Sequence, residues 1–297
     1  TLKKVTWSGI ALGAPAEITI YHPNQKEAED ILSNSYKKLV QLESLFSLYS
    51  DDSQLSMLNK NGYVKNPDPD MIALLNLSKK YAEITDGAFD VTVQPLWNLY
   101  NEAFTKTNKP PKEDEIEKTL NLVDWRSISV NKNLINYEVN GMSSTLNGIA
   151  QGYITDKISE NLINSGINNT LVQLGEYRGI GDHPDGRPWR LLLSNPEHTD
   201  TIGEIEFTNA AVATSAGLGT PFDLSGKYHH IFDPKNGYNA NKLLQVSVIA
   251  KTAAEADALA TAFLVLDQKA AEKIAKKLNV GFEIFDNSRN RKIITSI

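Results

Sequence analysis

The sequence predicts an α+β fold with mostly antiparallel sheets, and three observations lead to this prediction. Helical and strand patterns follow one another irregularly along the 297 residues, and many strand patterns come in pairs joined by short turns. This order is typical of hairpins beside helices and differs from the regular alternation of a doubly wound parallel sheet. No linker-like or low-complexity segment divides the chain, so we expect a single domain over residues 1–297, built of two interlocked halves.

Composition excludes several classes of protein and site. Hydrophobic residues make up 41% and charged residues 22%, which is ordinary for a globular protein, and no window has the length of a membrane span. The absence of cysteine excludes thiol catalysis, disulfides and cysteine-ligated zinc. A net charge of −6 argues against nucleic acid as a partner. An acidic protein that binds a phosphorylated molecule needs a metal ion or oriented backbone N–H groups.

The chain begins at Thr1 without an initiator methionine, a basic segment or an apolar signal segment. We therefore expect either a trimmed form or a mature form from which a signal has been removed. A cysteine-free chain suits an oxidising compartment without requiring one.

The first elements follow from local patterns. Val5–Ala11 and Glu17–Tyr21 alternate as two strands joined by a glycine- and proline-containing turn. Asn24 is a suitable N-cap, with Glu27 three residues later, for a helix whose apolar residues keep helical spacing as far as Phe46.

The middle of the chain alternates between helices and a hairpin. We expect a helix over about Asp70–Glu83, a polar loop over Asn101–Glu113, and a short helix ending at Leu120. Arg126–Val130 and Leu134–Val139 are expected to pair as a hairpin.

The last half is rich in strands between three helices. A helix is expected over roughly Gly148–Asn164 and ends at Gly166; Thr252 and Asp267 are expected to cap helices that end near Val265 and Leu278. The expected strands are Thr170–Leu174, Trp189–Leu193, Glu204–Phe207, Ala211–Thr214, Tyr228–Phe232, Leu243–Ala250, Gly281–Phe285 and Lys292–Thr295.

The segment Thr252–Thr261 contains a candidate metal site. Asp257 and Thr261 are four residues apart, so a helix places them one above the other at the edge of its apolar face. A carboxylate and a hydroxyl are hard oxygen ligands suited to Mg²⁺. The alternative is that Asp257 only stabilises the helix N-terminus.

Two further segments combine residues that a ligand site could use. Small residues at 148, 150 and 152 leave backbone groups uncovered at a helix start, where phosphates or a metal can approach; close helix packing explains them equally well. His229 and His230 precede an Asp-Pro turn, and a strand would direct one ring to each side. Either ring could be a base, although a histidine is more often structural.

Eight segments, in this order, resemble the ApbE-type FAD:protein FMN transferases over nearly the whole chain. They are Phe46–Asn59, Thr85–Pro95, Leu146–Asp156, Leu171–Gly181, Pro184–Leu193, Ala213–Gly217, Tyr228–Gly237 and Ala253–Thr261. The resemblance implies an α+β fold, similar to the T-fold, with duplicated halves that enclose the flavin. It also implies Mg²⁺-dependent cleavage of FAD, with FMN attached through a phosphoester to Thr or Ser of an acceptor protein and AMP released.

The resemblance also implies roles for single residues. Asp257, Thr261 and the backbone carbonyl of Ala150 are the expected metal ligands, and His230 is the expected base on the acceptor hydroxyl. The residues expected to contact FAD are Leu12, Tyr49, Ala88, Phe89, Asp90, Thr145, Gln151, His230 and Ile231. The implied acceptor is a membrane-associated redox subunit. The implied location is the periplasm or another exported position, with a lipid anchor on the precursor as an open alternative.

Three positions depart from the family pattern. Thr145 stands where the family often has Asp, Gln151 where it has Lys, and Glu176 where it has a second Gly. These differences concern the phosphate contacts more than the metal ligands. Two alternatives to transfer therefore remain: an FAD pyrophosphatase that uses water as acceptor, and a non-catalytic periplasmic flavin-binding or delivery protein.

Overall fold

The computed structural model describes residues 1–296, and its centre is one eight-stranded sheet in the order β1-β2-β6-β7-β10-β11-β12-β13. Every neighbouring pair in this sheet is antiparallel. The predicted α+β class is therefore confirmed. The strands are β1 Lys3–Ala11, β2 Ala14–His22, β6 Thr170–Gln173, β7 Tyr177–Ile180, β10 Ala210–Ala216, β11 Gln245–Ala250, β12 Gly281–Phe285 and β13 Arg291–Thr295.

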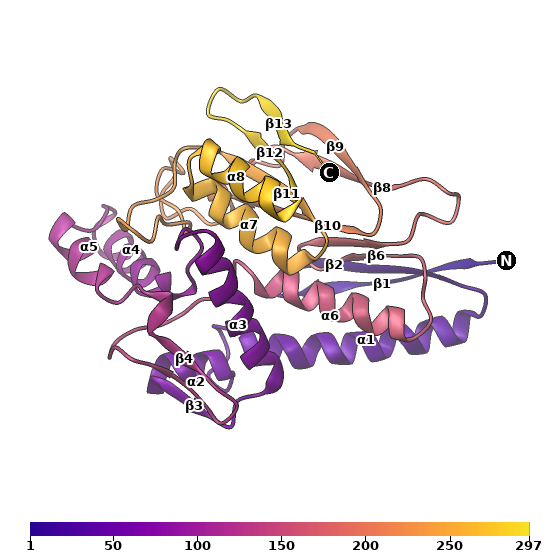
Figure 1. The fold of residues 1–297 in the computed structure, drawn as a ribbon, viewed down its shortest axis with the longest axis horizontal. Helices are drawn as coiled ribbons and strands as arrows, with labels where there is room; N and C mark the ends of the chain where they lie inside the picture. The colour runs from indigo at the N-terminus through magenta and orange to yellow at the C-terminus, as the bar shows by residue number, and fades with distance from the viewer. Residues whose placement is uncertain (297) are drawn as a thin grey trace.

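Four helices cover one face of this sheet (Figure 1). They are α1 (Gln25–Phe46), α6 (Ala150–Asn164), α7 (Ala253–Val265) and α8 (Gln268–Leu278). The predicted caps are confirmed, since the side chains of Asn24, Thr252 and Asp267 accept backbone N–H groups at the starts of α1, α7 and α8. Local capping residues thus determine where α1, α7 and α8 begin, whereas α6 begins without a side-chain cap.

The other face is covered by an antiparallel ribbon of β8 (Trp189–Ser194) and β9 (Thr201–Phe207). Trp189 and Phe207 of the ribbon belong to one apolar cluster with Val212 of β10, whereas the next residue, Ala213, belongs to the cluster on the helix side. Alternate residues of a strand point to opposite faces, so β10 separates the two cores.

The remaining elements lie together at one end of the large sheet (Figure 1). A small antiparallel sheet has the order β3-β5-β4. The elements are α2 Gln54–Asn61, β3 Tyr63–Lys65, α3 Pro69–Ile84, α4 Gln94–Thr107, α5 Glu113–Leu120, β4 Ile128–Val130 and β5 Leu134–Tyr137, with 3-10 turns at Val91–Val93, Trp125–Ser127 and Gly217–Gly219.

The predicted loop over Asn101–Glu113 is wrong in its first part, because α4 continues to Thr107. Leu96, Tyr100 and Phe104 recur every four residues and join one apolar cluster. This face stabilises the helix even though the intervening residues are polar. The sequence patterns also did not predict α2, β3 and β7, which are short.

The predicted strand Tyr228–Phe232 is also wrong. The segment forms only two isolated bridges, at His229 and at Phe232, within residues 1–296. The Phe232 ring packs against Tyr100 with centroids 5.0 Å apart. Aromatic packing on α4, rather than a strand ladder, therefore fixes this segment.

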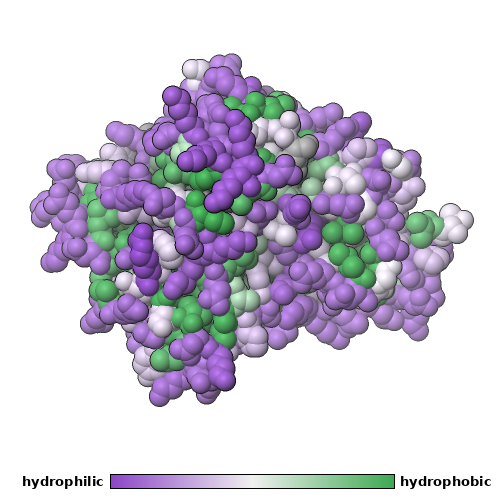
Figure 2. Space-filling model, in the orientation of Figure 1, coloured by the Kyte–Doolittle hydropathy of each residue, from purple (hydrophilic) through white to green (hydrophobic). Residues whose placement is uncertain are grey.

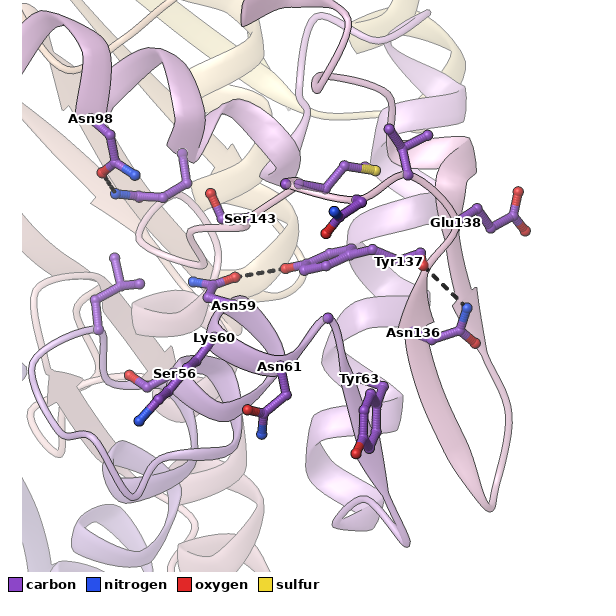
Figure 3. Close-up of a pocket in the computed structure, with 17 residues that line it drawn as sticks. Ser56, Asn59, Lys60, Asn61, Tyr63, Asn98, Asn136, Tyr137, Glu138 and Ser143 are labelled. Atoms are coloured by element: carbon purple, nitrogen blue, oxygen red, sulfur yellow. Dashed lines mark hydrogen bonds between the residues drawn. The ribbon is translucent and has the colours of Figure 1, made fainter.

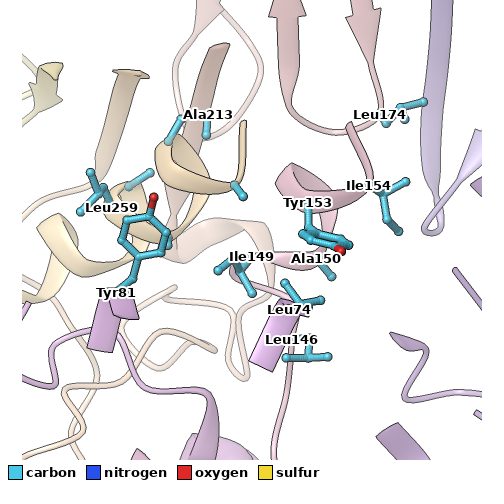
Figure 4. Close-up of a cluster of buried hydrophobic side chains, with 14 of the residues drawn as sticks. Leu74, Tyr81, Leu146, Ile149, Ala150, Tyr153, Ile154, Leu174, Ala213 and Leu259 are labelled. Carbon is cyan, nitrogen blue, oxygen red and sulfur yellow. The ribbon is translucent and has the colours of Figure 1, made fainter. Parts of the chain in front are cut away.

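The core beside the start of α6 joins four parts of the chain (Figure 4). Ile149 and Ile154 lie among Leu74 of α3, Leu174 after β6 and Leu259 of α7, and all five are buried. This packing holds the N-terminus of α6 against α7, where the candidate site lies.

The surface in Figure 2 is mostly hydrophilic, with hydrophobic residues in small separate patches. Across residues 1–296, none of the helices has both the length and the apolar character needed to cross a bilayer.

Candidate functional site

The two predicted side-chain ligands lie on α7, at its contact with α6. Asp257 is 3% exposed, and its Oδ2 accepts a hydrogen bond of 3.0 Å from the backbone N–H of Gly152. A Cβ at Gly152 would lie 2.3 Å from the carbonyl oxygen of Ala253, so only glycine allows the two helices to approach this closely. Gly152 therefore serves helix packing, and that packing brings Asp257 to the helix start that contains Ala150.

Asp257 differs from its expected place at the edge of an apolar face, since it is inside the protein. The periodicity of α7 could not show this, because eleven of its thirteen residues are buried and the helix has no exposed face. A buried carboxylate without a cation is costly, so its position implies a specific partner.

Thr261 lies one turn after Asp257 and close to two other segments of the chain. Its Oγ1 is 3.3 Å from the Oγ of Ser215 at the end of β10. A Cβ at Gly148 would lie 3.2 Å from this Oγ1 and 3.2 Å from the ring of Phe89. Thr261 therefore lies against the end of β10 and the loop before α6, and the Phe89 ring lies against the same Gly148 of that loop.

Two more carboxylates lie near Asp257, and the sequence predicts a role for neither of them. Asp156 accepts the backbone N–H groups of Ala253 and Ala254 at 2.8 and 2.9 Å and pairs with Arg178. It therefore neutralises the N-terminus of α7 and already has a cation. Glu176 is 6% exposed and belongs to no ion pair in the part of the chain that the structure describes.

Burial raises the pKa of both Asp257 and Glu176. The pKa of Asp257 is raised to about 7, by burial first and then by Asp156, against the opposing hydrogen bond from Gly152. Burial and the charge of Asp257 raise the pKa of Glu176 well above its usual value. Two close carboxylates in a dry site favour a bound cation, because only a counter-charge lets both ionise.

These donors fit Mg²⁺ in chemistry. A carboxylate, a hydroxyl and a backbone carbonyl are hard oxygen ligands, and Mg²⁺ is commonly held by one or two carboxylates together with substrate phosphates. Residues 1–296 contain no group of three or more His, Cys, Asp and Glu side chains arranged around one metal position. With one carboxylate, one hydroxyl and one backbone carbonyl as its ligands, the protein would leave other positions on the ion to a substrate.

The two histidines have different surroundings, although the strand expected to separate them is absent. Both ring nitrogens of His229 have partners: Nε2 is 3.2 Å from Oδ1 of Asn241, and Nδ1 accepts the N–H of Ile231 at 3.2 Å. The Nδ1 of His230 is buried and has no partner within residues 1–296. Burial, and secondarily His229, lowers the pKa of His230 to about 4.

His230 is therefore neutral at physiological pH, as a general base must be. Its backbone N–H donates to the carbonyl of Thr220 at 3.1 Å. Ser215 contacts Thr261, and Thr220 follows Ser215 by five residues. Five extended residues span at most about 18 Å, so Thr220, which is bonded to His230, lies within that distance of Ser215.

Four expected FAD-contact residues lie close to the metal ligands. Phe89 adjoins Thr261 through Gly148, and Ala88 precedes it in the same buried loop. The N–H of Thr145 donates to the carbonyl of Val91 at 2.8 Å, which joins that loop to the segment before α6. The side chain of Gln151 lies against Gly175, where a Cβ would be 2.7 Å from its Nε2.

Two other residues expected to contact FAD, Asp90 and Ile231, are buried. The carboxylate of Asp90 is buried and accepts the N–H and hydroxyl of Thr92 and the N–H of Trp125 at 2.8, 2.6 and 3.1 Å. Its side chain therefore shapes the loop in this structure. Ile231 is buried beside the histidines. Their contact with FAD stays a prediction.

Leu12 is hydrogen-bonded to α1, and Tyr49 follows the end of α1 in the chain. Leu12 lies in the turn between β1 and β2, and its N–H donates to Glu43 at 3.0 Å. Tyr49 follows α1 and is 94% exposed. Neither makes a hydrogen bond to the residues around Asp257 within residues 1–296, so their roles also stay predictions.

Comparisons with known proteins identify the family of this chain. The family model described as "ApbE family" matches residues 12–285. The FAD:protein FMN transferase of Haemophilus influenzae is 29% identical, over 97% of this chain and 88% of the relative, and that of Vibrio cholerae is 27% identical, over 92% and 85%. The solved ApbE protein of Thermotoga maritima is 28% identical with a TM-score of 0.86, covering 98% of this chain and 97% of its own. The flavin transferase ApbE of Vibrio cholerae is 24% identical with a TM-score of 0.85, covering 99% and 97%. With the family model spanning more than half of its length, the chain belongs to the ApbE family.

Proposed function

We propose that this protein cleaves FAD with the help of Mg²⁺ and transfers FMN to a Thr or Ser hydroxyl of an acceptor protein, with release of AMP. The observation that carries the proposal is the buried Asp257 at the N-terminus of α6, which forms no ion pair within residues 1–296, together with Thr261 on the next turn. The relatives named FAD:protein FMN transferase support the same reaction.

Each residue has a defined task in this reaction. Asp257, Thr261 and the carbonyl of Ala150 would hold Mg²⁺, which offsets the charge of the pyrophosphate when it is bound. At the start of α6 the N–H of Gly152 is bonded to Asp257 and that of Ala150 to Leu146, so we assign the N–H of Gln151 to a phosphate. His230 accepts the proton of the acceptor hydroxyl. The hydroxyl oxygen then forms a bond to the phosphorus of the FMN half, and the bond from that phosphorus to the AMP phosphate breaks.

The acceptor and the location belong to the same proposal. We infer a membrane-associated redox subunit as acceptor and a periplasmic or other exported location, on the strength of the family resemblance. A hydrolytic reaction would use the same site with water in place of the hydroxyl, so the acceptor is what separates the two reactions.

The test is incubation with FAD, Mg²⁺ and an isolated acceptor domain that carries a Thr flavinylation site. We expect the intact mass of the domain to increase by that of FMN less one water, and AMP to appear in equal amount. AMP release without a mass gain on any acceptor would support the pyrophosphatase instead. FAD binding without AMP release would support a flavin-delivery protein.

Gln151 offers a second test, because the family has lysine there. We expect Gln151→Lys to lower the Mg²⁺ concentration needed for FAD binding about tenfold, since a charge-assisted bond to phosphate contributes about 1.5–3 kcal/mol. Calorimetry with FAD across a Mg²⁺ series measures this. Gln268→Lys, at the exposed start of α8, is the matched control. An unchanged Mg²⁺ requirement in Gln151→Lys would show that residue 151 is remote from the pyrophosphate.

A further inference from the structure

A large polar groove lies in the part of the protein formed by α2, β3 and α4, and none of the metal ligands or the two histidines is among its lining residues. It has a volume of about 810 Å³ and is lined from three sides by α2 with β3, by α4, and by residues 136–143 (Figure 3). Pockets that hold small ligands have roughly 300–1,000 Å³, so the groove has room for a short peptide segment.

The lining is rich in carboxamides. Six of its residues are Asn or Gln, namely Asn59, Asn61, Gln94, Asn98, Asn136 and Asn140. A carboxamide offers both donors and an acceptor, which matches the N–H and C=O groups of an extended polypeptide. Lys60 and Glu138 are the only charged residues of the lining, and their charges cancel. The groove therefore suits a neutral polar chain better than a doubly charged pyrophosphate.

Some of these side-chain amides hold the protein's own loops, and others are available to a ligand. Asn59 accepts the N–H of Ser144 at 2.7 Å and donates to its carbonyl at 2.8 Å, which fixes the loop on α2. The side chains of Asn61 and Asn140 are exposed and make no hydrogen bond to another residue within 1–296. These two are available to a partner.

The groove is within reach of the reaction centre. Ser143 lines it, and Gly148, against Thr261, follows five residues later. An extended chain of five residues spans at most about 18 Å, so the groove ends within that distance of Gly148. A bound peptide of a few residues can therefore span from the groove to Thr261.

An aromatic side chain stands exposed in the groove. Tyr63, which lines it, is 45% exposed. Exposed tyrosines are typical anchors of protein interfaces, because a large ring is buried at a low cost in conformational entropy.

We propose that this groove binds an extended segment of the acceptor protein, next to the Thr or Ser that receives FMN. The inference rests on the proposed transferase function. It adds the surface that selects the acceptor, and it separates acceptor recognition from FAD binding.

The test compares Asn61→Trp and Asn140→Trp, which fill the groove, with Asn133→Trp as matched control. Asn133 is also exposed and lies at the opposite end of β5. The probe is an isolated acceptor domain of a membrane redox subunit with a Thr flavinylation site. We expect KM for this domain to rise about tenfold or more in both groove variants. The FAD affinity, the slow release of AMP into water and the melting temperature should equal those of the control.

Each other result has a distinct meaning. An unchanged KM in both groove variants would overturn the inference and leave the proposed function standing. If FAD affinity falls by the same factor as FMN transfer in the groove variants, the groove binds FAD, and this result also overturns the inference. If the wild-type protein labels no acceptor domain, the proposed function fails and the inference fails with it.

Discussion

Asp257→Asn is expected to reduce Mg²⁺-dependent AMP release and FMN transfer by about 10²-fold or more, the usual cost of losing one electrostatic group at a reacting centre. Asparagine keeps an oxygen that can accept the N–H of Gly152, so the contact between α6 and α7 should remain. The variant removes the charge that would hold the metal. AMP release by chromatography and FMN transfer by mass spectrometry measure the two losses.

The same variant has a readout that does not depend on activity. The pKa of Asp257 is raised to about 7 in the folded protein, against about 4 in an unfolded chain. A raised carboxyl pKa means that the metal-free protein loses stability as the pH rises from about 4 to 7, because the buried charge is unfavourable. Without Mg²⁺, Asp257→Asn should therefore melt higher than wild type at pH 8 and alike at pH 4.

Mg²⁺ should reverse this order. Binding to the folded state raises the melting temperature of wild type, and the variant lacks the charge that binds the ion. Thr261→Val is the graded control, since a lost hydroxyl should weaken the metal effect less than a lost carboxylate does. Equal stabilisation of wild type and Asp257→Asn by Mg²⁺ would place the metal elsewhere.

The sequence predicted those elements whose signals are local. The caps at Asn24, Thr252 and Asp267 each act within three residues, and all three are confirmed. The wrong strand prediction at residues 228–232 arises because this segment is held by a distant part of the chain. An apolar pattern resembled a strand there, but α4, more than a hundred residues earlier, supplies the aromatic packing that holds it.

Some features of the candidate site also follow from local sequence, and others depend on contacts between distant segments. The four-residue spacing of Asp257 and Thr261 places them on one helix, and the structure agrees. The burial of Asp257, and its neighbours Asp156 and Glu176, could not be predicted from spacing. They depend on contacts of α7 with α6, about a hundred residues earlier in the chain, and with Glu176 just before β7. The only early signal was the departure at Glu176, where a charged residue replaces glycine.

His230→Ala is expected to lower FMN transfer by about 10²–10⁴-fold, the usual contribution of a general base, while FAD affinity stays near that of wild type. A hydroxyl is a weak nucleophile at neutral pH, so removing the base affects the chemical step more than the binding step. In-gel flavin fluorescence of the acceptor domain measures transfer, and calorimetry measures FAD binding. The effect should appear in kcat and leave KM for the acceptor nearly unchanged.

His229→Ala is the matched control, and the structure refines what it should do. The ring of His229 bonds Asn241 and Ile231 and packs against Gly217, so its loss should lower the melting temperature. Transfer per folded molecule should remain within a few-fold of wild type. A loss confined to His229→Ala, or equal in both variants after correction for folded protein, would mean that His230 is not the base. Unchanged transfer in both would direct attention to Asp233, whose carboxylate accepts Lys235 N–H at 3.0 Å and the Asn236 amide at 3.1 Å and would have to release them to take a proton.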